Sequence, residues 1–341
     1  MSSDFVLTAL NARDYLVQKS FIRSDEEVSI SPLGGGISSV VLLVEWRAPL
    51  ERRWVVKQAL EKLDVKADWR SERSRILREA LSLQKLRPVL GPAALPEVIY
   101  TDPERFLYIM TAAPVGSVSW KETLLARRAD AQVAHNAGLL LAKIINASRD
   151  DATLSSEFWD RAVFYQLRVE PYYRSTASRH PELRREFQDL IATSLNIRTS
   201  LVHGDYSPKN MLVLGENIFL IDFEVVHWGD PSFDAAFLLN HLFLKAFHQP
   251  AVSAQYIALA YDFWHALLAA LDRQAATGIE FMTLRHLGGL MLARIDGKSP
   301  VEYIEDSATK ERVRKAARRI LVEGPRSLEH AADIVRAEIG V

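Results

Sequence analysis

Two acidic side chains and one amide lie near the middle of the chain, at spacings that suit phosphate chemistry. Asp205 and Asn210 share one polar loop, and Asp222 follows after two short apolar runs. Those runs, 211–214 and 218–221, are too short for helices and are typical of buried strands, with a turn at 215–217 between them. We therefore expect both carboxylates and the amide oxygen to meet at one end of a hairpin.

This set of oxygens could support phosphoryl transfer from ATP. Asp205 would orient the attacking hydroxyl and accept its proton, while Asn210 and Asp222 would hold Mg²⁺ against the phosphates, because Mg²⁺ prefers hard oxygen ligands. Lys209 could stabilise charge on the transferring phosphoryl group, and a solvent-facing lysine is the equally weighted alternative. For one Asp an ordinary turn residue would be the better interpretation, but the spaced set favours the catalytic one.

The same residues carry a family resemblance. The run from His203 to Asn210 reads His-Gly-Asp-x-x-x-x-Asn and is followed by Ile-Asp-Phe-Glu at 221–224. It resembles the catalytic segment of aminoglycoside phosphotransferases and choline kinases, and the His-Arg-Asp and Asp-Phe-Gly motifs of protein kinases. The resemblance implies supporting roles for His203 and for Asp234, which would bond the backbone of the catalytic loop. An N-cap role is the alternative for Asp234.

The resemblance also implies the fold class: α+β, in the two-lobed protein-kinase-like fold. A small N-terminal nucleotide-binding lobe, 1–113, would hold an antiparallel sheet and one helix. A larger, mostly helical C-terminal lobe, 114–341, would hold the catalytic and substrate-binding residues. The apolar patterns predict strands at 28–33, 40–46, 54–59, 94–100 and 106–110, a helix at 71–86 ended by Pro88, and then helices at 131–147, 155–173, 181–195, 233–247, 256–275, 281–295, 307–321 and 327–339.

The first lobe contains the residues expected to bind the nucleotide. A glycine-rich turn lets backbone N–H groups approach phosphate, and neighbouring serines add donors. Lys57 resembles the kinase strand lysine that contacts the α- and β-phosphates, and Glu79 resembles its helix partner, with Glu72 as the alternative. The remaining nucleotide-binding candidates are Gly34, Gly35, Gly36, Ser38, Ser39, and the adenine-contacting segment with Thr111 and Ala113.

A narrower resemblance concerns the acceptor. The run Val56-Lys-Gln-Ala-Leu60, Trp69 in the next loop, and Arg294-Ile resemble methylthioribose kinases, which implies substrate roles for Trp69 and Arg294. Those enzymes carry a different catalytic loop and paired arginines, whereas this chain has Ala293-Arg294. The phosphate chemistry therefore transfers to this chain and the sugar identity does not.

The predicted function is thus an ATP-dependent kinase acting on a hydroxyl of a small metabolite or an aminoglycoside-like compound. The alternative is a nucleotide-binding pseudokinase or interaction module, but every chemical residue of the motif set is present. A protein kinase is disfavoured, because Gly204 replaces the arginine that reads a phosphorylated activation loop. The stretch from Asp222 to Asp234 also leaves no room for a long activation segment.

Composition sets limits on the remaining classes. The chain of 341 residues has 48% hydrophobic and 25% charged residues, a formal net charge of −1 and no Cys. The lack of Cys excludes disulfides, thiolate zinc sites and a cysteine nucleophile. The small net charge gives no reason to expect nucleic acid or membrane partners. A cytoplasmic protein is expected, its oligomeric state is not indicated, and the basic run at 310–319 predicts an amphipathic surface helix.

Overall fold

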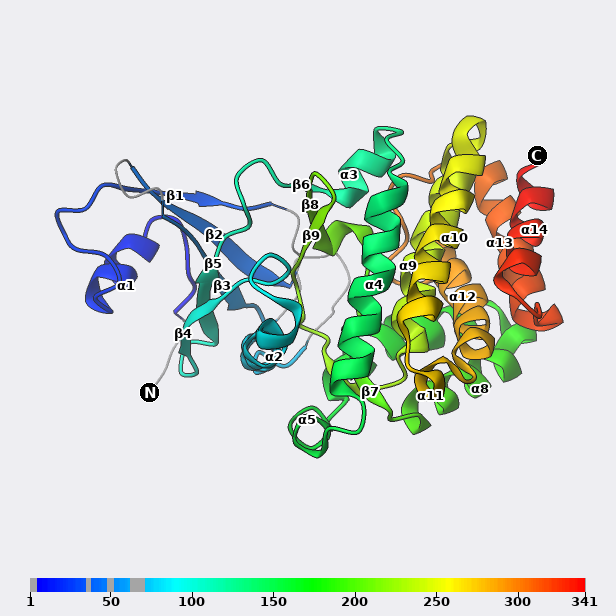
Figure 1. Cartoon of the computed structure of the whole chain (residues 1–341), viewed down its shortest axis with the longest axis horizontal. Helices are drawn as coiled ribbons and strands as arrows, with labels where there is room; N and C mark the ends of the chain where they lie inside the picture. The colour runs from blue at the N-terminus through cyan, green and yellow to red at the C-terminus, as the bar shows by residue number, and fades with distance from the viewer. Residues whose placement is uncertain (1–4, 35–37, 48–51, 62–70, 341) are drawn as a thin grey trace. The chain divides into compact units, whose positions relative to one another are not determined.

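The computed structural model describes residues 5–34, 38–47, 52–61 and 71–340. The chain divides into two compact units, Met1–Val115 and Gly116–Val341, shown from blue to red along the chain in Figure 1. The first unit is built around a sheet and the second around helices, as the predicted fold class requires.

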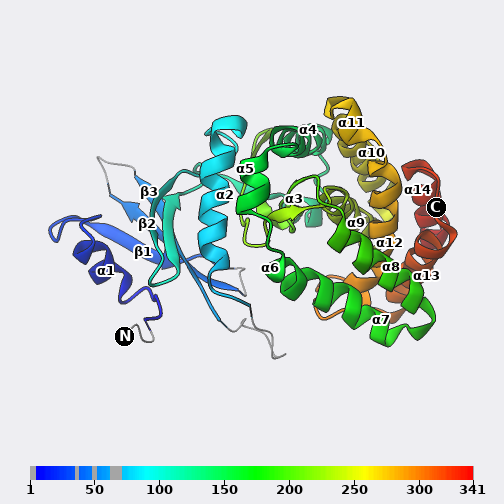
Figure 2. The same cartoon turned by 90° about the horizontal axis from the view of Figure 1, so that it is seen from below.

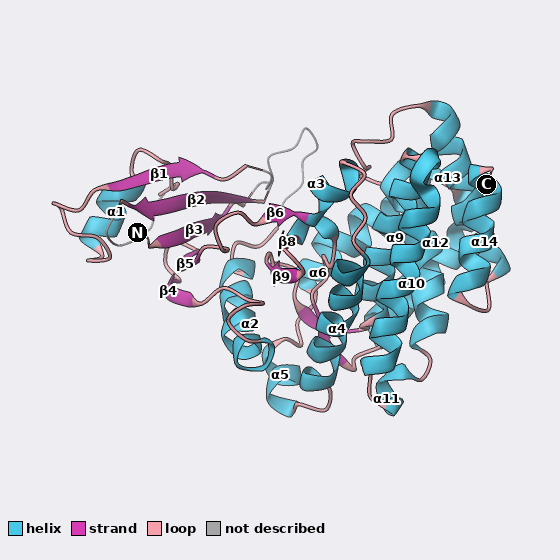
Figure 3. Ribbon diagram, turned by 45° about the horizontal axis from the view of Figure 1, so that its top comes forward, coloured by secondary structure: helices cyan, strands magenta, loops and turns pink. Residues whose placement is uncertain are grey.

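An antiparallel sheet organises the N-terminal unit. Its described elements are α1 (Ala12–Gln18), β1 (Val28–Pro32), β2 (Ser39–Trp46), β3 (Arg53–Ala59), α2 (Arg75–Leu90), β4 (Val98–Asp102) and β5 (Leu107–Thr111). The strand order is β1-β2-β3-β5-β4, drawn in magenta in Figure 3. Alternate residues such as Leu42, Val44 and Ile109 point into one core, where Tyr15 and Leu16 of α1 pack against them. Period-two burial of this kind explains why the strand pattern was readable in the sequence.

Helix α2 packs on β3, β4 and β5 (Figure 2). Its buried face includes Ile76, Glu79, Ala80 and Leu83, at helical spacing. The prediction that Pro88 ends this helix is wrong, since α2 continues to Leu90 and ends at Gly91, whose φ is 88°. A proline in the last turn removes only one backbone hydrogen bond, and the left-handed glycine provides the actual stop.

Helices make up most of the C-terminal unit, and its described strands form one pair, β10-β7, and one triplet, β6-β8-β9. The described elements are β6 (Val118–Ser119), α3 (Trp120–Leu125), α4 (Ala131–Ser148), α5 (Ala152–Glu157), α6 (Ala162–Phe164), the π-helix η1 (Tyr165–Arg174), α7 (Ser175–Arg179), η2 (Pro181–Leu183), α8 (Arg184–Asn196), β7 (Ser200–Val202), η3 (Pro208–Asn210), β8 (Met211–Leu214), β9 (Asn217–Leu220), β10 (His227–Gly229), α9 (Ser232–His248), η4 (Pro250–Val252), α10 (Ser253–Ala270), α11 (Arg273–Ala276), α12 (Ile279–Asp296), α13 (Ser307–Glu323) and α14 (Leu328–Ile339).

Two predicted helices are interrupted in the structure. The single helix predicted at 155–173 is wrong, because α5 ends at Glu157 and Asp160 starts a new turn by accepting from the Ala162 N–H at 2.9 Å. The chain then enters η1, where Pro171 lies inside the π-helix. The helix predicted at 256–275 likewise divides into α10 and α11. Local capping by Asp explains the first break, and a long apolar pattern alone did not reveal it.

Helix α9 is the core of the C-terminal unit, and its residues from Ser232 to Phe247 are all buried. It packs against α10 and α12, and α10 also lies along α4 (Figure 1). The α4–α10 contact is close at Gly138, where a Cβ would lie 2.3 Å from the carbonyl oxygen of Phe263. Glycine is therefore needed there for backbone contact between the two helices.

The basic run forms α13, an amphipathic helix as predicted. Val313, Ala317 and Ile320 are buried, while Arg314 pairs with Asp296 at 2.8 Å and Arg318 with Glu182 at 3.0 Å. These two arginines thus serve local ion pairs. Within the described ranges, none of the helices combines the length and the apolar character that a bilayer crossing requires.

Candidate functional site

The β8–β9 hairpin positions two of the predicted chemical residues. Met211 pairs with Leu220 in an antiparallel register, and the Ile221 N–H extends this ladder by donating to the Asn210 carbonyl at 3.0 Å. Asn210 and Asp222 are therefore brought to the same end of the hairpin. The two short apolar runs act as strands, as the sequence predicts.

Gly204 lets the loop before the hairpin turn sharply. Its φ is 76°, and a Cβ added there would lie 2.7 Å from a side-chain carbon of Val225 and 2.9 Å from the Val225 carbonyl oxygen. A left-handed conformation and this close approach both require glycine. The loop therefore requires glycine for steric reasons at the position where the His-Arg-Asp motif of protein kinases has arginine.

Asp234, at the start of α9, holds the backbone of that loop. Its carboxylate accepts from the N–H of His203 at 2.6 Å and from the N–H of Gly204 at 2.9 Å. The side chain is fully buried, and burial raises its pKa to about 7 although both backbone bonds favour the ionised form. These are the bonds that the family resemblance implied for Asp234.

The ring of His203 links the catalytic loop to the segment before Asp222. Its Nδ1 accepts from the Asp205 N–H at 3.2 Å, and its Nε2–H donates to the Ile221 carbonyl at 3.1 Å. Burial lowers its pKa to about 4, so the ring is neutral at physiological pH, and the two bonds assign the proton to Nε2. His203 therefore joins the backbone of Asp205 to the backbone of Ile221, the residue before Asp222.

Asp205 is a buried carboxylate held by two cations. Its Oδ2 lies 3.1 Å from Nη2 of Arg168 and 2.8 Å from Nζ of Lys209. Burial by itself raises the pKa of Asp205, but the charges of Lys209 and Arg168 outweigh it and hold the pKa well below its ordinary value. The carboxylate is thus ionised and oriented, as a group that positions a hydroxyl must be.

Arg168 is a site residue that the sequence analysis missed. Its Nε donates to the Gly204 carbonyl at 2.6 Å, and its side chain is only 6% exposed. It comes from η1, a π-helix, and π-helical segments are often associated with functional sites. The available signal was an arginine in the apolar stretch Leu167-Arg-Val169, where a buried charge needs a partner.

Asn210 and Asp222 have the ligand chemistry for Mg²⁺. The Asn210 amide nitrogen donates to the Asp205 carbonyl at 2.9 Å, so Oδ1 is the atom that could contact a cation. Asp222 has a φ of 69°, a left-handed conformation that costs energy for a non-glycine residue. No group of three or more His, Asp or Glu side chains suited to a metal occurs in the described ranges, so phosphate oxygens and water would complete the shell.

The N-terminal unit contains its own predicted pair. Nζ of Lys57 on β3 lies 2.8 Å from both carboxylate oxygens of Glu79 on α2. Lys57 is 6% exposed and Glu79 is fully buried. The structure therefore pairs Lys57 with Glu79, and Glu72, the alternative, uses its backbone carbonyl to accept from Arg75.

The other nucleotide-binding candidates are only partly described. Ser38 and Ser39 are buried, and the Ser38 carbonyl accepts from Arg75 at 2.5 Å. Thr111 ends β5, and the Ala113 carbonyl accepts from Arg53 at 2.9 Å. Among the described residues, no atom lies within 4 Å of a Cβ added at Gly34. Gly35, Gly36 and Trp69 lie outside the described residues.

Arg294, the remaining substrate candidate, lies on α12. Its Nη1 donates to the Tyr172 hydroxyl at 3.2 Å and to Oγ of Ser299 at 2.9 Å. Tyr172 comes from η1, four residues after Arg168. Arg294 is thereby connected to the segment that supports Asp205, a contact between residues far apart in the sequence.

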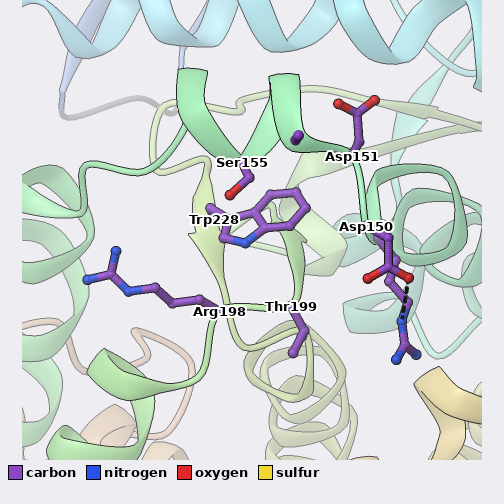
Figure 4. Close-up of a pocket in the computed structure, with 8 residues that line it drawn as sticks. Asp150, Asp151, Ser155, Arg198, Thr199 and Trp228 are labelled. Atoms are coloured by element: carbon purple, nitrogen blue, oxygen red, sulfur yellow. Dashed lines mark ion pairs between the residues drawn. The ribbon is translucent and has the colours of Figure 1, made fainter.

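A separate pocket of about 290 Å³ lies elsewhere in the C-terminal unit. Figure 4 shows Trp228 at its centre, with Asp150 and its ion pair to Arg149 at one side. The Asp151 carboxylate caps the short helix α5 by accepting from the N–H groups of Thr153 and Leu154. None of the predicted site residues lines this pocket, so it does not bear on the phosphate chemistry.

Three solved structures with similar folds are distant from this chain in sequence. An amicoumacin kinase in complex with AMP-PNP, Ca²⁺ and Ami aligns with a TM-score of 0.56 at 12% identity, covering 94% of this chain and 96% of that one. The ADP-bound aminoglycoside phosphotransferase APH(2'')-Ib aligns with a TM-score of 0.51 at 17% identity, covering 93% and 100%. A Plasmodium vivax ethanolamine kinase aligns with a TM-score of 0.52 at 12% identity, covering 96% and 86%.

These likenesses establish the two-lobed kinase-like fold. No curated protein matches the chain. The family model described as "Phosphotransferase enzyme family" matches residues 29–280, which include the strand with Lys57, the catalytic loop and Asp222. The chain therefore belongs to the phosphotransferase enzyme family.

Proposed function

We propose that this protein is an ATP-dependent kinase that transfers the γ-phosphate to a hydroxyl group of a small molecule. The observation that supports it most directly is the Asp205 carboxylate, buried and held ionised beside two cations on a loop that ends at Asn210. Membership of the phosphotransferase family supports the same reaction. Relatives of similar fold are a kinase in complex with AMP-PNP and an ADP-bound phosphotransferase, which favours ATP as the donor.

The N-terminal unit would hold the nucleotide. Lys57, fixed by Glu79, would contact its phosphates, since a lysine ammonium is a compact charge suited to phosphate oxygens. Ser38, Ser39 and the glycine-rich turn would add donors, and the backbone around Thr111 and Ala113 would meet the adenine. Mg²⁺ held by Asn210 and Asp222 would neutralise charge on the triphosphate.

The C-terminal unit would carry out the transfer. Both cations contact Oδ2 of Asp205, so the acceptor hydroxyl would donate to Oδ1. The hydroxyl oxygen forms a bond to the γ-phosphorus, the bond between that phosphorus and the β,γ-bridging oxygen breaks, and the proton passes to Asp205 as ADP leaves. Lys209, whose side chain is 49% exposed, could then follow the charge on the phosphoryl oxygens.

The substitution Asp205→Asn tests this proposal. It keeps the size of the side chain and removes the charge that orients and deprotonates the hydroxyl. We expect turnover, measured as ADP release with ATP and Mg²⁺, to fall by about a hundredfold to ten-thousandfold. Nucleotide affinity measured by calorimetry should be retained, and near wild-type turnover would refute the role of Asp205. A pseudokinase would show no Asp205-dependent ADP release at all.

A cytoplasmic location of the protein stays a prediction.

A further inference from the structure

A second group of cationic side chains lies beyond Asp205 in the C-terminal unit. The ring of Tyr172 connects it to the catalytic loop. The guanidinium of Arg168 lies 5.5 Å from the centre of that ring, and the guanidinium of Arg294 lies 5.8 Å from it. Arg294 is therefore one aromatic ring away from the arginine that contacts Asp205.

Arg294 is bonded only to neutral groups. Its Nη1 donates to the Tyr172 hydroxyl, to Oγ of Ser299 and to the Ser299 carbonyl. Across residues 5–34, 38–47, 52–61 and 71–340, no carboxylate lies within 4 Å of it, and its Nε is buried without a hydrogen-bond partner. An arginine in such a setting usually pairs with an anion, because its planar guanidinium binds carboxylate or phosphate through two parallel bonds.

Lys245 shows the same lack of an anionic partner. It is fully buried on α9, and its Nζ makes only a long contact of 3.4 Å with the His241 carbonyl, within the part of the chain that is described. The ring of Tyr303 lies 5.2 Å from Nζ, and the Tyr303 hydroxyl is itself buried without a described partner. Burial of a lysine at this cost is unusual unless something compensates the charge.

The local charge balance points in one direction. Glu302, an acidic residue near Lys245, is paired with Lys121. Burial and the nearby charges of Lys121 and Arg294 together lower the pKa of Lys245 to about 7, against the opposing charge of Glu302. The whole chain has a net charge of only −1, so this positive excess is a local feature. A bound anion would supply negative charge beside Arg294 and Lys245.

We propose that Arg294, Lys245 and Tyr303 form an anion subsite that holds a carboxylate or phosphate group of the acceptor. The inference rests on the proposed function, because it names the class of molecule whose hydroxyl reaches Asp205: an anionic hydroxyl compound. An aminoglycoside-like or choline-like cation would meet uncompensated positive charge there, which disfavours it. Lys209 and Arg168 contact Asp205 directly and are left for the transferring phosphate.

A matched set of small hydroxyl compounds tests the subsite. Glycerate carries a carboxylate, glycerol 3-phosphate a phosphate, glycerol no charge and serinol a cation, on similar three-carbon skeletons. Their binding is measured by calorimetry with the full chain, in saturating Mg²⁺ and a non-hydrolysable ATP analogue so that the nucleotide phosphate positions are occupied. We expect at least one anion to bind tenfold or more tightly than glycerol and serinol, and the better anion identifies the group recognised.

Two substitutions locate the preference. Lys245→Met and Arg294→Met should each lower anion affinity about tenfold and leave glycerol binding unchanged, while Lys315→Met removes one exposed charge of α13 and should have no effect. Thermal melting checks folding, and Arg294→Lys is the milder variant if Arg294→Met does not fold. The proposal is wrong if neither anion is preferred over glycerol and serinol, or if both variants keep the wild-type preference.

The outcome can be separated from that of the proposed function. Without an added acceptor, water takes the phosphoryl group and ADP is released slowly. Loss of this release in Asp205→Asn tests the phosphoryl transfer by itself. If that release depends on Asp205 but no anion is preferred, only the subsite is wrong. If no Asp205-dependent release occurs although the anions bind through Lys245 and Arg294, the kinase assignment fails, and the subsite stands as an anion site but loses its role in acceptor recognition.

Discussion

Nζ of Lys209 lies 2.8 Å from Oδ2 of Asp205, although the two residues are separated by a turn that includes Pro208. The side chain of Asp205 is 4% exposed and that of Lys209 is 49% exposed. A partly exposed cation beside a buried carboxylate is suited to a charge that develops during the reaction.

Lys209→Met should therefore affect the chemical step more than nucleotide binding. Removing the ammonium raises the pKa of Asp205, because the nearest of its two cations is lost. We expect a lower rate of phosphoryl transfer, nearly intact ATP affinity, and an acidic limb of the pH–rate profile that moves to higher pH. Lys315→Met serves as the control for loss of one positive charge. A kinetically silent Lys209→Met would leave only the interpretation of a solvent-facing lysine.

Asp222→Ala should weaken nucleotide binding only when Mg²⁺ is present. Asp222 lies at the same end of the β8–β9 hairpin as Asn210 and would supply the charged ligand, whereas the amide would supply a neutral one. Calorimetry of ATP binding with and without Mg²⁺ measures the difference. Asp205→Asn, which leaves both ligands in place, should lose less of the Mg²⁺-dependent affinity. Equal Mg²⁺-ATP affinity in Asp222→Ala and wild type would contradict the metal assignment.

The residues that could be predicted are those fixed by local chain geometry. Asp205, Asn210 and Asp222 belong to one loop and one hairpin, so two short apolar runs and a turn were enough to bring them together. The strand of Lys57 and the helix of Glu79 were predicted from the spacing of their apolar residues. The two motifs follow one another as in kinases, which suggested the ion pair between Lys57 and Glu79.

The residues that could not be predicted come from distant helices. Arg168 reaches Asp205 from η1, and Lys245 lies on α9 with Tyr303 beyond α12. In the sequence Arg168 and Lys245 are each a single charge between apolar neighbours, and only the packing of the helices determines whether such a charge is buried and what lies beside it. The prediction that the helix ends at Pro88 was wrong because a proline in the last turn costs too little to stop a helix that packs on a sheet.

The Lys57–Glu79 pair gives a stability prediction for the N-terminal unit. Lys57→Met leaves the Glu79 carboxylate fully buried beside an apolar side chain, and we expect the free energy of unfolding to fall by about 3–5 kcal/mol. The double change Lys57→Met with Glu79→Leu should recover much of that loss, because neither charge of the pair then remains. Both variants should bind ATP weakly. Denaturant unfolding measures the effect, with Glu27→Gln in the exposed Arg47–Glu27 pair as a control that should change little.

Lys245 should make the free energy of unfolding depend on pH, because burial disfavours its charged form. Its folded-state pKa is about 7, and in the unfolded chain it should be close to 10.4. Between these values the unfolded chain holds a proton that the folded protein has released, so the free energy of unfolding contributed by this residue rises with pH through that window. Below pH 7 both states are protonated, and the full cost of a buried ammonium is present.

Lys245→Met removes that cost. The variant should be more stable than the wild type at pH 6, and the difference should shrink by up to about 1.4 kcal/mol per pH unit from pH 7 to pH 9. Paired denaturant titrations at several pH values measure it, kept below pH 10 so that tyrosine ionisation does not interfere. A difference that stays constant from pH 6 to pH 9 would show that Lys245 stays protonated in the folded protein and that burial does not lower its pKa. A gain in stability together with a loss of anion binding would show that the buried ammonium is retained for the ligand, because a lysine kept only for packing would lose stability when replaced.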